Sequence, residues 1–295
     1  MIKQFSQKTC AFDAEWVPCP RSVRRLLNLP ASTSDEEAFL AIWQHTDPAW
    51  APSDDRPHRF AGHPFIKLAL SQVVSIVGVV RTVERDGNIR LGLRSRGIHE
   101  HEEGKMIQDF LEGVASQGYQ LWGYHSSRSD VPILIQRALA LGIQLPHFAR
   151  RPLRPWDGHD YFDARNSQAH VDLLAVTQSQ WGANSPKLTD LAAACGIPVK
   201  VEITAWRQPI DGENVAQLYL EDHIDLIVAY NEFDALTNHL LMLRVAHLGA
   251  FLDDRQYERE KVALRGLLEQ EIEAGKAHLA DYRDRWDELE QEART

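Results

Sequence analysis

Two acidic residues lie two positions apart in an apolar stretch near the start of the chain. Residues 10–18 read Cys-Ala-Phe-Asp-Ala-Glu-Trp-Val-Pro, which is typical of the end of a strand. Because side chains alternate between the faces of a strand, Asp13 and Glu15 point the same way and Trp16 points into the other layer. Two carboxylates this close repel each other unless a cation lies near, and paired hard oxygen ligands suit Mg²⁺ or Mn²⁺. On its own the pair also fits a solvated strand end.

Three further residues of suitable chemistry follow along the chain. Asp130 comes at the junction between a short buried strand, residues 120–124, and a helix with Pro132 near its start. Tyr230 and Asp234 are four apart on a predicted long helix, so they share one face of it. The chain therefore offers four acids and a tyrosine in the order strand, strand end, helix.

The elements that position these residues form an α/β pattern. Strands are expected at 71–84 and 89–94, and the turn Asp86-Gly87 predicts that they pair as a hairpin. Helices are expected where apolar residues recur three and four apart or where clear start and stop signals flank a segment. These helices cover residues 100–114, 131–139, 187–195 and a long stretch from about 215 or 221 to 243.

Two segments stand apart from this alternation. Residues 18–65 are rich in proline and lack sustained strand alternation, so they are predicted to be an N-terminal insertion of short helices and loops that serves as a lid. Residues 251–295 are highly charged with apolar residues at helical spacing. We expect this C-terminal helical tail to pack on the body, residues 1–250, or on a second copy in a homo-oligomer.

Composition narrows the class of partner. The 295 residues carry 32 Lys and Arg against 42 Asp and Glu, a net charge of −10, and 44% of them are hydrophobic, enough for a well-packed core. The protein is therefore no polycation, and any contact with nucleic acid must be local. The candidate basic patches are Arg21, Arg24 and Arg25; Arg81, Arg90, Arg94 and Arg96; and Arg150, Arg151 and Arg154.

Targeting and redox signals are weak in this sequence. The three cysteines have neither an even count nor the spacing of zinc ligands, which argues against a disulfide framework. We find no signal peptide and no apolar run of membrane-spanning length, so the protein is predicted to be cytoplasmic, with no membrane partner.

Taken in order, these motifs resemble the DEDD exonuclease superfamily in its tyrosine-type branch (DEDDy). The likeness is to the predicted 3′–5′ exonucleases related to the proofreading domain of B-family DNA polymerases. Residues 12–18 are similar to the first family motif, Phe-Asp-Ile-Glu-Thr-Val-Pro, residues 124–134 to the second, and residues 230–234 to the Tyr-x-x-x-Asp third motif. The resemblance covers about residues 9–247 and implies a ribonuclease H-like fold, a mixed five-stranded sheet flanked by helices with its first three strands antiparallel.

The resemblance also implies roles for these residues. The family uses a two-metal-ion mechanism, in which two divalent ions, Mg²⁺ or Mn²⁺, activate water and offset charge on the leaving oxygen. Asp13 would bridge both ions, Glu15 and Asp234 would complete the nucleophile-side site, and Asp130 would hold the second ion. Tyr230 would orient the attacking water. The expected activity is a 3′–5′ exonuclease acting on single-stranded 3′ ends, with DNA slightly favoured over RNA.

Some residues around the acids depart from the family pattern. His125 replaces the usual Asn, Ser129 the usual Phe and Trp16 the usual Thr. His125 and Trp16 are our candidate substrate-binding residues, whereas Asp172 is either a supporting carboxylate or a structural cap. Four further aromatic residues are candidates for base stacking or for ordinary packing: Trp122, Trp156, Tyr161 and Trp181.

Two rival interpretations stay open. The first is an exoribonuclease that trims RNA 3′ ends on the same fold. The second is a catalytically silent nucleic-acid-binding module that kept the fold, and the presence of all four acids and the tyrosine speaks against it.

Overall fold

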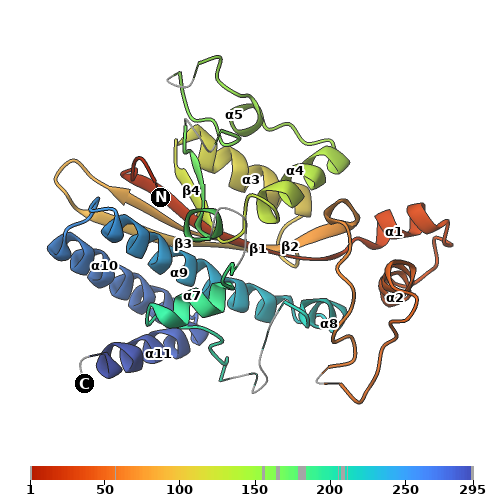
Figure 1. The fold of residues 1–295 in the computed structure, drawn as a ribbon. Helices are drawn as coiled ribbons and strands as arrows, with labels where there is room; N and C mark the ends of the chain where they lie inside the picture. Colours follow the sequence, from red (N-terminus) through yellow and green to blue (C-terminus); the bar gives the residue numbers. More distant parts are fainter. Residues whose placement is uncertain are drawn as a thin grey trace.

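A five-stranded mixed sheet forms the centre of the molecule (Figure 1). The computed structural model describes residues 2–56, 58–154, 157–163, 167–178, 184–204, 206, 210 and 212–293. The strands are β1 (Lys8–Pro18), β2 (Ser71–Val83), β3 (Ile89–Gly97), β4 (Gln120–Gly123) and β5 (His170–Asp172). Their spatial order is β3-β2-β1-β4-β5. The pairs β1–β2 and β2–β3 are antiparallel, and β1–β4 and β4–β5 are parallel, which confirms the expected ribonuclease H-like fold.

Helices cover both faces of the sheet. They are α1 (Pro20–Leu27), α2 (Asp35–Thr46), α3 (Glu103–Ser116), α4 (Asp130–Leu141), α5 (Pro146–Ala149), α6 (Leu173–Thr177), α7 (Leu188–Ala194), α8 (Val215–Leu220), α9 (Ile224–Leu248), α10 (Asp254–Glu273) and α11 (His278–Glu292), with a 3₁₀ turn at Leu68–Leu70. No helix among the described residues is both long enough and apolar enough to cross a membrane.

The two faces of β1 belong to different apolar cores. Phe12 and Ala14 are buried with residues of α3 and α4, whereas Ala11 and Val17 are buried with residues of α9. The predicted alternation is therefore correct, and it places Asp13 on the face that α9 covers.

The hairpin between β2 and β3 forms at the predicted turn. Gly87 has a φ of 82°, which only glycine adopts readily, and the Asp86 carboxylate accepts a hydrogen bond of 2.9 Å from the N–H of Asn88.

Two starts are open for the predicted long helix, about residue 215 or residue 221, and the later one is closer to the structure, because the chain breaks this stretch into α8 and α9. Asp222 lies between them with a φ of 62°, and the N–H of His223 bonds to the carbonyl of Leu218 at 2.8 Å to close α8. Aspartate tolerates this left-handed conformation better than most residues, so it supplies the stop.

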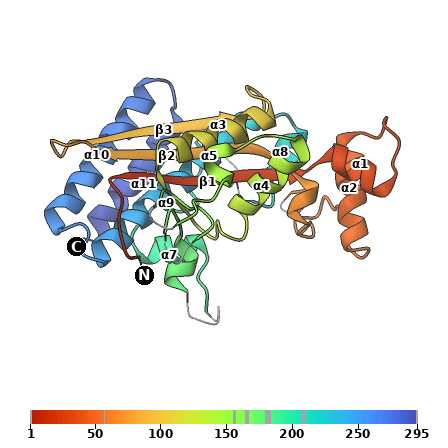
Figure 2. The same ribbon diagram turned by 90° about the horizontal axis from the view of Figure 1, so that it is seen from above.

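The insertion contains α1 and α2, which lie beyond the end of β1 (Figure 2). A capping box starts α2, since the Ser34 N–H donates to Glu37 at 2.7 Å and the Glu37 N–H donates to the Ser34 hydroxyl at 3.2 Å. The prediction of short helices and loops at 18–65 is confirmed in this part of the chain.

The tail forms a helical pair that packs on α9 and β3 (Figure 1). Leu264, Leu268 and Tyr282 are fully buried in the core that α9 also occupies. The division of the chain at residue 250 and the homo-oligomer stay predictions, but the apolar residues of the tail already have a partner within the chain.

A buried ion pair fastens the tail to the sheet. The Arg81 guanidinium on β2 donates to both carboxylate oxygens of Glu260 on α10, at 2.5 and 2.9 Å, and both side chains are almost fully buried. The Phe5 ring lies 4.8 Å from this guanidinium. Arg81 was a candidate for contact with nucleic acid, and its burial shows that this expectation is wrong.

Replacing one member of this pair should destabilise the protein strongly. We expect Glu260→Ala to lower the free energy of unfolding by about 3–5 kcal/mol, because it leaves the Arg81 charge buried without its partner. The matched control is Glu258→Ala on the same helix, whose pair with Lys261 is exposed, and it should change stability by less than about 1 kcal/mol. Urea unfolding measures both, and equal effects would mean that the tail is not fastened by this pair.

Candidate metal centre

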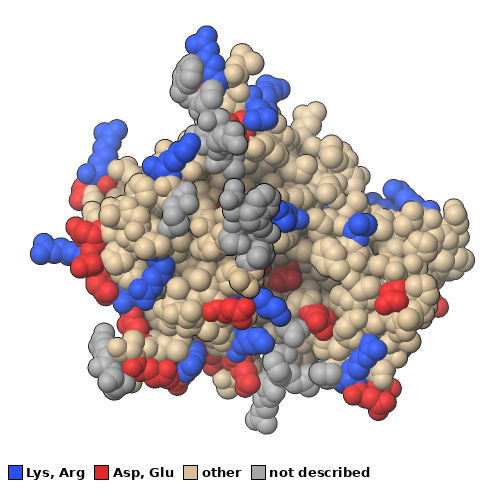
Figure 3. Space-filling view, in the orientation of Figure 1, with Lys and Arg blue, Asp and Glu red and all other residues tan. Residues whose placement is uncertain are grey.

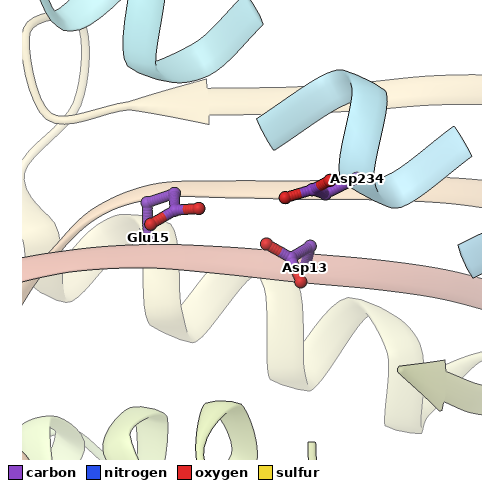
Figure 4. Close-up of side chains that lie close together, drawn as sticks. All are labelled: Asp13, Glu15 and Asp234. Carbon is purple, nitrogen blue, oxygen red and sulfur yellow. The ribbon is translucent and has the colours of Figure 1, made fainter. Parts of the chain in front are cut away.

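Three carboxylates from two elements converge on one side of the sheet (Figure 4). One oxygen from each of Asp13, Glu15 and Asp234 lies within 4.8 Å of the other two. Asp13 and Glu15 come from the same face of β1, and Asp234 comes from α9, which crosses that face. All three side chains are half-buried. The structure thus brings together three of the four predicted metal ligands.

Two buried asparagines on α9 dock it against β1 and β2. The Asn238 amide donates to the carbonyl of Phe12 at 3.0 Å. In one orientation of the Asn231 amide, both its NH₂ group and its oxygen have hydrogen-bond partners. The NH₂ group then donates to Oδ2 of Asp13 at 3.2 Å, and the oxygen accepts from the Ser75 hydroxyl at 2.9 Å. Sequence reasoning missed both residues. Asn231 lies three residues before Asp234 and Asn238 four residues after it, so all three share one face of the helix. This spacing is the sequence signal that could have identified the two asparagines.

Asp130 lies in the same groove but outside the group of three. It is the first residue of α4 and is buried. Its carboxylate accepts a hydrogen bond from the N–H of Ala14 at 3.2 Å and another from the Ser129 hydroxyl at 2.6 Å. The first of these bonds ties Asp130 to β1 between Asp13 and Glu15, and the charge of Asp130 raises the pKa of Asp13. Its role as a ligand of a second ion stays a prediction.

Three of the acids, Asp13, Asp130 and Asp234, hold their protons more tightly than free acids do. Burial raises the pKa of Asp13 well above its usual range, and the charges of Asp130, Asp234 and Glu15 raise it further. Burial raises the pKa of Asp234 to about 6, against a hydrogen bond from Tyr230 that lowers it. Burial likewise raises the pKa of Asp130 to about 6. A cation would relieve this repulsion, and a set of carboxylate oxygens fits Mg²⁺ or Mn²⁺.

Tyr230 stays a neutral phenol in this site. Burial raises its pKa well above the usual range, and the charges of Asp234, Glu15 and Asp13 add to that effect. The phenol lies one helical turn before Asp234 and donates a hydrogen bond to it. Tyr230 can therefore donate and orient, but it cannot act as a base near neutral pH.

A groove of about 340 Å³ contains Asp13, Glu15, Asp130 and Asp234. Its walls come from the end of β1, from residues 63–66 of the insertion, and from the start of α4 and part of α8. Trp16 is half-buried in this wall, and its contact with substrate stays a prediction. Figure 3 shows acidic atoms recessed near the centre of one face, with Lys and Arg in separate groups around it.

His125 lies outside this wall. It is exposed in the turn between β4 and α4 with a φ of 57°, and its carbonyl accepts a hydrogen bond from the Ser129 hydroxyl at 2.9 Å. The described residues that line the groove do not include it, so its contact with substrate stays a prediction.

The remaining candidates have structural roles where the structure describes them. Asp172 caps α6 by accepting from the N–H groups of Leu174 and Ala175 at 3.0 and 3.3 Å, so the structural alternative is correct. Trp122 is fully buried, and the Tyr161 hydroxyl donates to the carbonyl of Tyr119 at 2.8 Å within the core. Base stacking by these two aromatic residues is therefore wrong. Trp156 and Trp181 lie outside the described residues.

The raised pKa values predict how the metal-free protein responds to pH. A carboxyl whose pKa is higher in the folded chain than in the unfolded chain binds its proton more readily when folded, so folding stability rises as the pH falls. For Asp130 and Asp234 the gain begins as the pH drops through about 6 and is complete below their unfolded values near 4. Melting curves recorded in chelator should show that the wild type is less stable at pH 7.5 than at pH 5.5. This difference between the two pH values should be smaller in Asp234→Asn, which lacks one of the titrating carboxyls.

Divalent cations should stabilise the protein through the same site. We expect Mn²⁺ at 100 times its dissociation constant to add about 2.7 kcal/mol to the free energy of unfolding. Asp13→Asn should abolish this gain and leave the stability in chelator equal or higher, because it removes one of the repelling charges. Asp54→Asn, an exposed carboxylate outside the groove wall, is the control and should keep the full response. A loss of stability for Asp13→Asn in chelator would make Asp13 a structural residue.

Comparison with known proteins identifies the family of this chain. Among solved structures, the family B DNA polymerase from the hyperthermophilic archaeon Pyrobaculum calidifontis is similar, with a TM-score of 0.42 and 16% identity over 82% of this chain and 24% of the polymerase chain. No curated protein matches the sequence. Residues 63–286, more than half of the chain, match a family described as a predicted 3′–5′ exonuclease related to the exonuclease domain of PolB. The match begins after Asp13 and Glu15, so the contribution of β1 to the site rests on the structure. The chain belongs to this family of predicted 3′–5′ exonucleases.

Proposed function

We propose that the protein is a metal-dependent 3′–5′ exonuclease that hydrolyses phosphodiester bonds at single-stranded 3′ ends, with DNA slightly favoured. The observation that carries the proposal is the convergence of Asp13, Glu15 and Asp234 within 4.8 Å. These acids lie in a groove, next to Asp130 and to a tyrosine that stays protonated. Membership of the exonuclease family supports the same chemistry.

The four acids serve to hold two divalent cations, Mg²⁺ or Mn²⁺. Asp13 would be shared by the two cations, Glu15 and Asp234 would complete the site of the first, and Asp130 would hold the second. Cations held there would make water more acidic and would offset negative charge on the phosphate and on the leaving 3′ oxygen. Asn231 fixes the Asp13 carboxylate through its amide, and Ser129 and the Ala14 N–H fix Asp130. The ligands are therefore held in place before substrate arrives.

Tyr230 positions the attacking water in this proposal. Its hydroxyl donates to Asp234, so it lies beside the nucleophile-side ligands. Because its pKa is raised, the phenol keeps its proton throughout the neutral range and contributes orientation rather than proton abstraction.

Digestion of labelled oligomers tests the proposal. With Mn²⁺, a 5′-labelled single-stranded DNA oligomer should yield a ladder that shortens from the 3′ end, and Asp13→Asn should yield none. Matched RNA run in parallel decides between the DNA enzyme and an exoribonuclease. Binding of both oligomers without cleavage of either would leave the silent binding module as the correct interpretation.

Replacing Tyr230 by phenylalanine should separate chemistry from binding. The substitution removes only the hydroxyl, and the ring still packs on α9 one turn before Asp234. We expect single-turnover cleavage to slow on the order of 10²-fold, the effect expected of a group that orients a nucleophile. Metal affinity and oligomer affinity should change little.

Tyr119→Phe is a suitable control, since Tyr119 lines a different cavity. Wild-type cleavage rates in the Tyr230→Phe variant at saturating Mn²⁺ would reduce Tyr230 to a packing residue.

A further inference from the structure

The insertion supplies one wall of the groove that contains the acids. Residues 63–66, His-Pro-Phe-Ile, at the end of the insertion, line the groove together with the end of β1 and the start of α4. Within this wall Phe65 is 74% exposed, whereas Ile66 beside it is 8% exposed. A phenylalanine this exposed, at the edge of a catalytic groove, is a place where an apolar or aromatic partner can bind.

Contacts on both sides of Phe65 hold this wall in place. The His63 ring stacks on the Trp43 ring with 4.6 Å between centroids, and Trp43 is fully buried. The Gly62 N–H donates to Glu213 at 3.1 Å, which ties the wall to the segment before α8. Pro64, just before Phe65, has a fixed φ. Ile66, just after Phe65, is buried in the core. Phe65 is therefore presented to the groove from a fixed support.

We propose that Phe65 stacks on a nucleobase within the last few nucleotides of the substrate strand, and so makes the insertion the element that selects unpaired ends. This inference rests on the proposed exonuclease function. The acids would bind the scissile phosphate through their cations, so a base attached to that strand lies within the same groove. Aromatic stacking accepts any base, because every base has a flat face, but it requires that the face be free of its duplex neighbours. Phe65 would therefore select unpaired bases without regard to their sequence.

A series of abasic oligomers tests the contact directly. Each oligomer is single-stranded DNA with one abasic nucleotide at one of its last four positions, and its affinity is measured by fluorescence anisotropy with Mn²⁺. The proteins are Tyr230→Phe, which is expected to cleave slowly and to keep its metal affinity, and the double variant Tyr230→Phe with Phe65→Ala. The anisotropy is read before the oligomer is cleaved. Removing the base that stacks on Phe65 should weaken binding about tenfold in the first protein, as expected for one stacked base, and hardly at all in the second.

Conservative variants separate stacking from simple apolar contact. Phe65→Trp should keep the full response to the missing base, and Phe65→Leu, which keeps an apolar side chain without a ring, should lose most of it. Phe162→Ala removes a phenylalanine that is 44% exposed and does not line the groove, so it should behave as the parent protein. Since Phe65 is exposed, its replacement should leave the melting temperature nearly unchanged.

The outcomes distinguish the two proposals. If Phe65→Ala keeps the same response as its parent at all four positions, the stacking role of Phe65 is overturned, whatever the enzyme cleaves. If wild-type protein with Mn²⁺ cleaves neither DNA nor RNA, the exonuclease proposal fails, and the anisotropy series still reports whether Phe65 contacts a base. Both proposals are supported if the wild-type enzyme cleaves and Phe65→Ala has a tenfold lower kcat/KM on the intact oligomer. The two enzymes should then have similar kcat/KM values on the oligomer that lacks the stacked base.

Discussion

The repulsion among carboxylates on one face of β1 is the constraint on which the rest of the structure depends. One oxygen from each of Asp13, Glu15 and Asp234 lies within 4.8 Å of the other two, and burial raises the pKa values of Asp13 and Asp234. Such an arrangement persists only if stronger contacts nearby hold the two elements together. The amides of Asn231 and Asn238 supply two of these contacts, and the Thr237 hydroxyl lies 3.1 Å from that of Tyr282 on α11. The tail therefore braces α9 from the side away from the sheet.

Two acids on α9, Glu232 and Asp234, have different surroundings and therefore different roles. Glu232 is buried, which opposes its charge, yet His278 and Lys276 at 2.5 and 2.8 Å lower its pKa. Asp234, two residues later, faces other acids, and its pKa is raised to about 6. Glu232 keeps its charge because the Lys276 ammonium and a hydrogen bond with His278 stabilise it, so it holds the tail to α9. Burial and the charge of Asp130 disfavour the Asp234 carboxylate, and only the Tyr230 hydroxyl favours it, so a metal ion would stabilise its charge.

Local rules of the chain explain why much of the site could be predicted from the sequence. Strand alternation alone put Asp13 and Glu15 on one face, and helical spacing put Tyr230 and Asp234 together. Contacts between distant segments follow no local rule. The partner of Arg81 is Glu260, 179 residues away, so a candidate surface arginine turned out to be buried. Trp122 and Tyr161 were ambiguous for the same reason, because the burial of an aromatic side chain depends on tertiary packing.

Different side-chain contacts hold the acids and the groove wall. The wall at residues 63–66 is supported by an aromatic cluster around Trp43, whose ring centroid lies 5.2 Å from that of Trp50 and 5.4 Å from that of Phe60. The acids are fixed instead by the asparagines of α9 and by hydrogen bonds to Asp130. Both supports rest on one apolar core, in which Trp43 and Ile66 lie with Ala11 of β1. The hydrogen bonds that fix the acids involve none of the wall residues 63–66, so changes on the groove side of the wall need not disturb the carboxylates. The fold can in this way adjust which strand ends it accepts while its hydrolytic residues stay where they are.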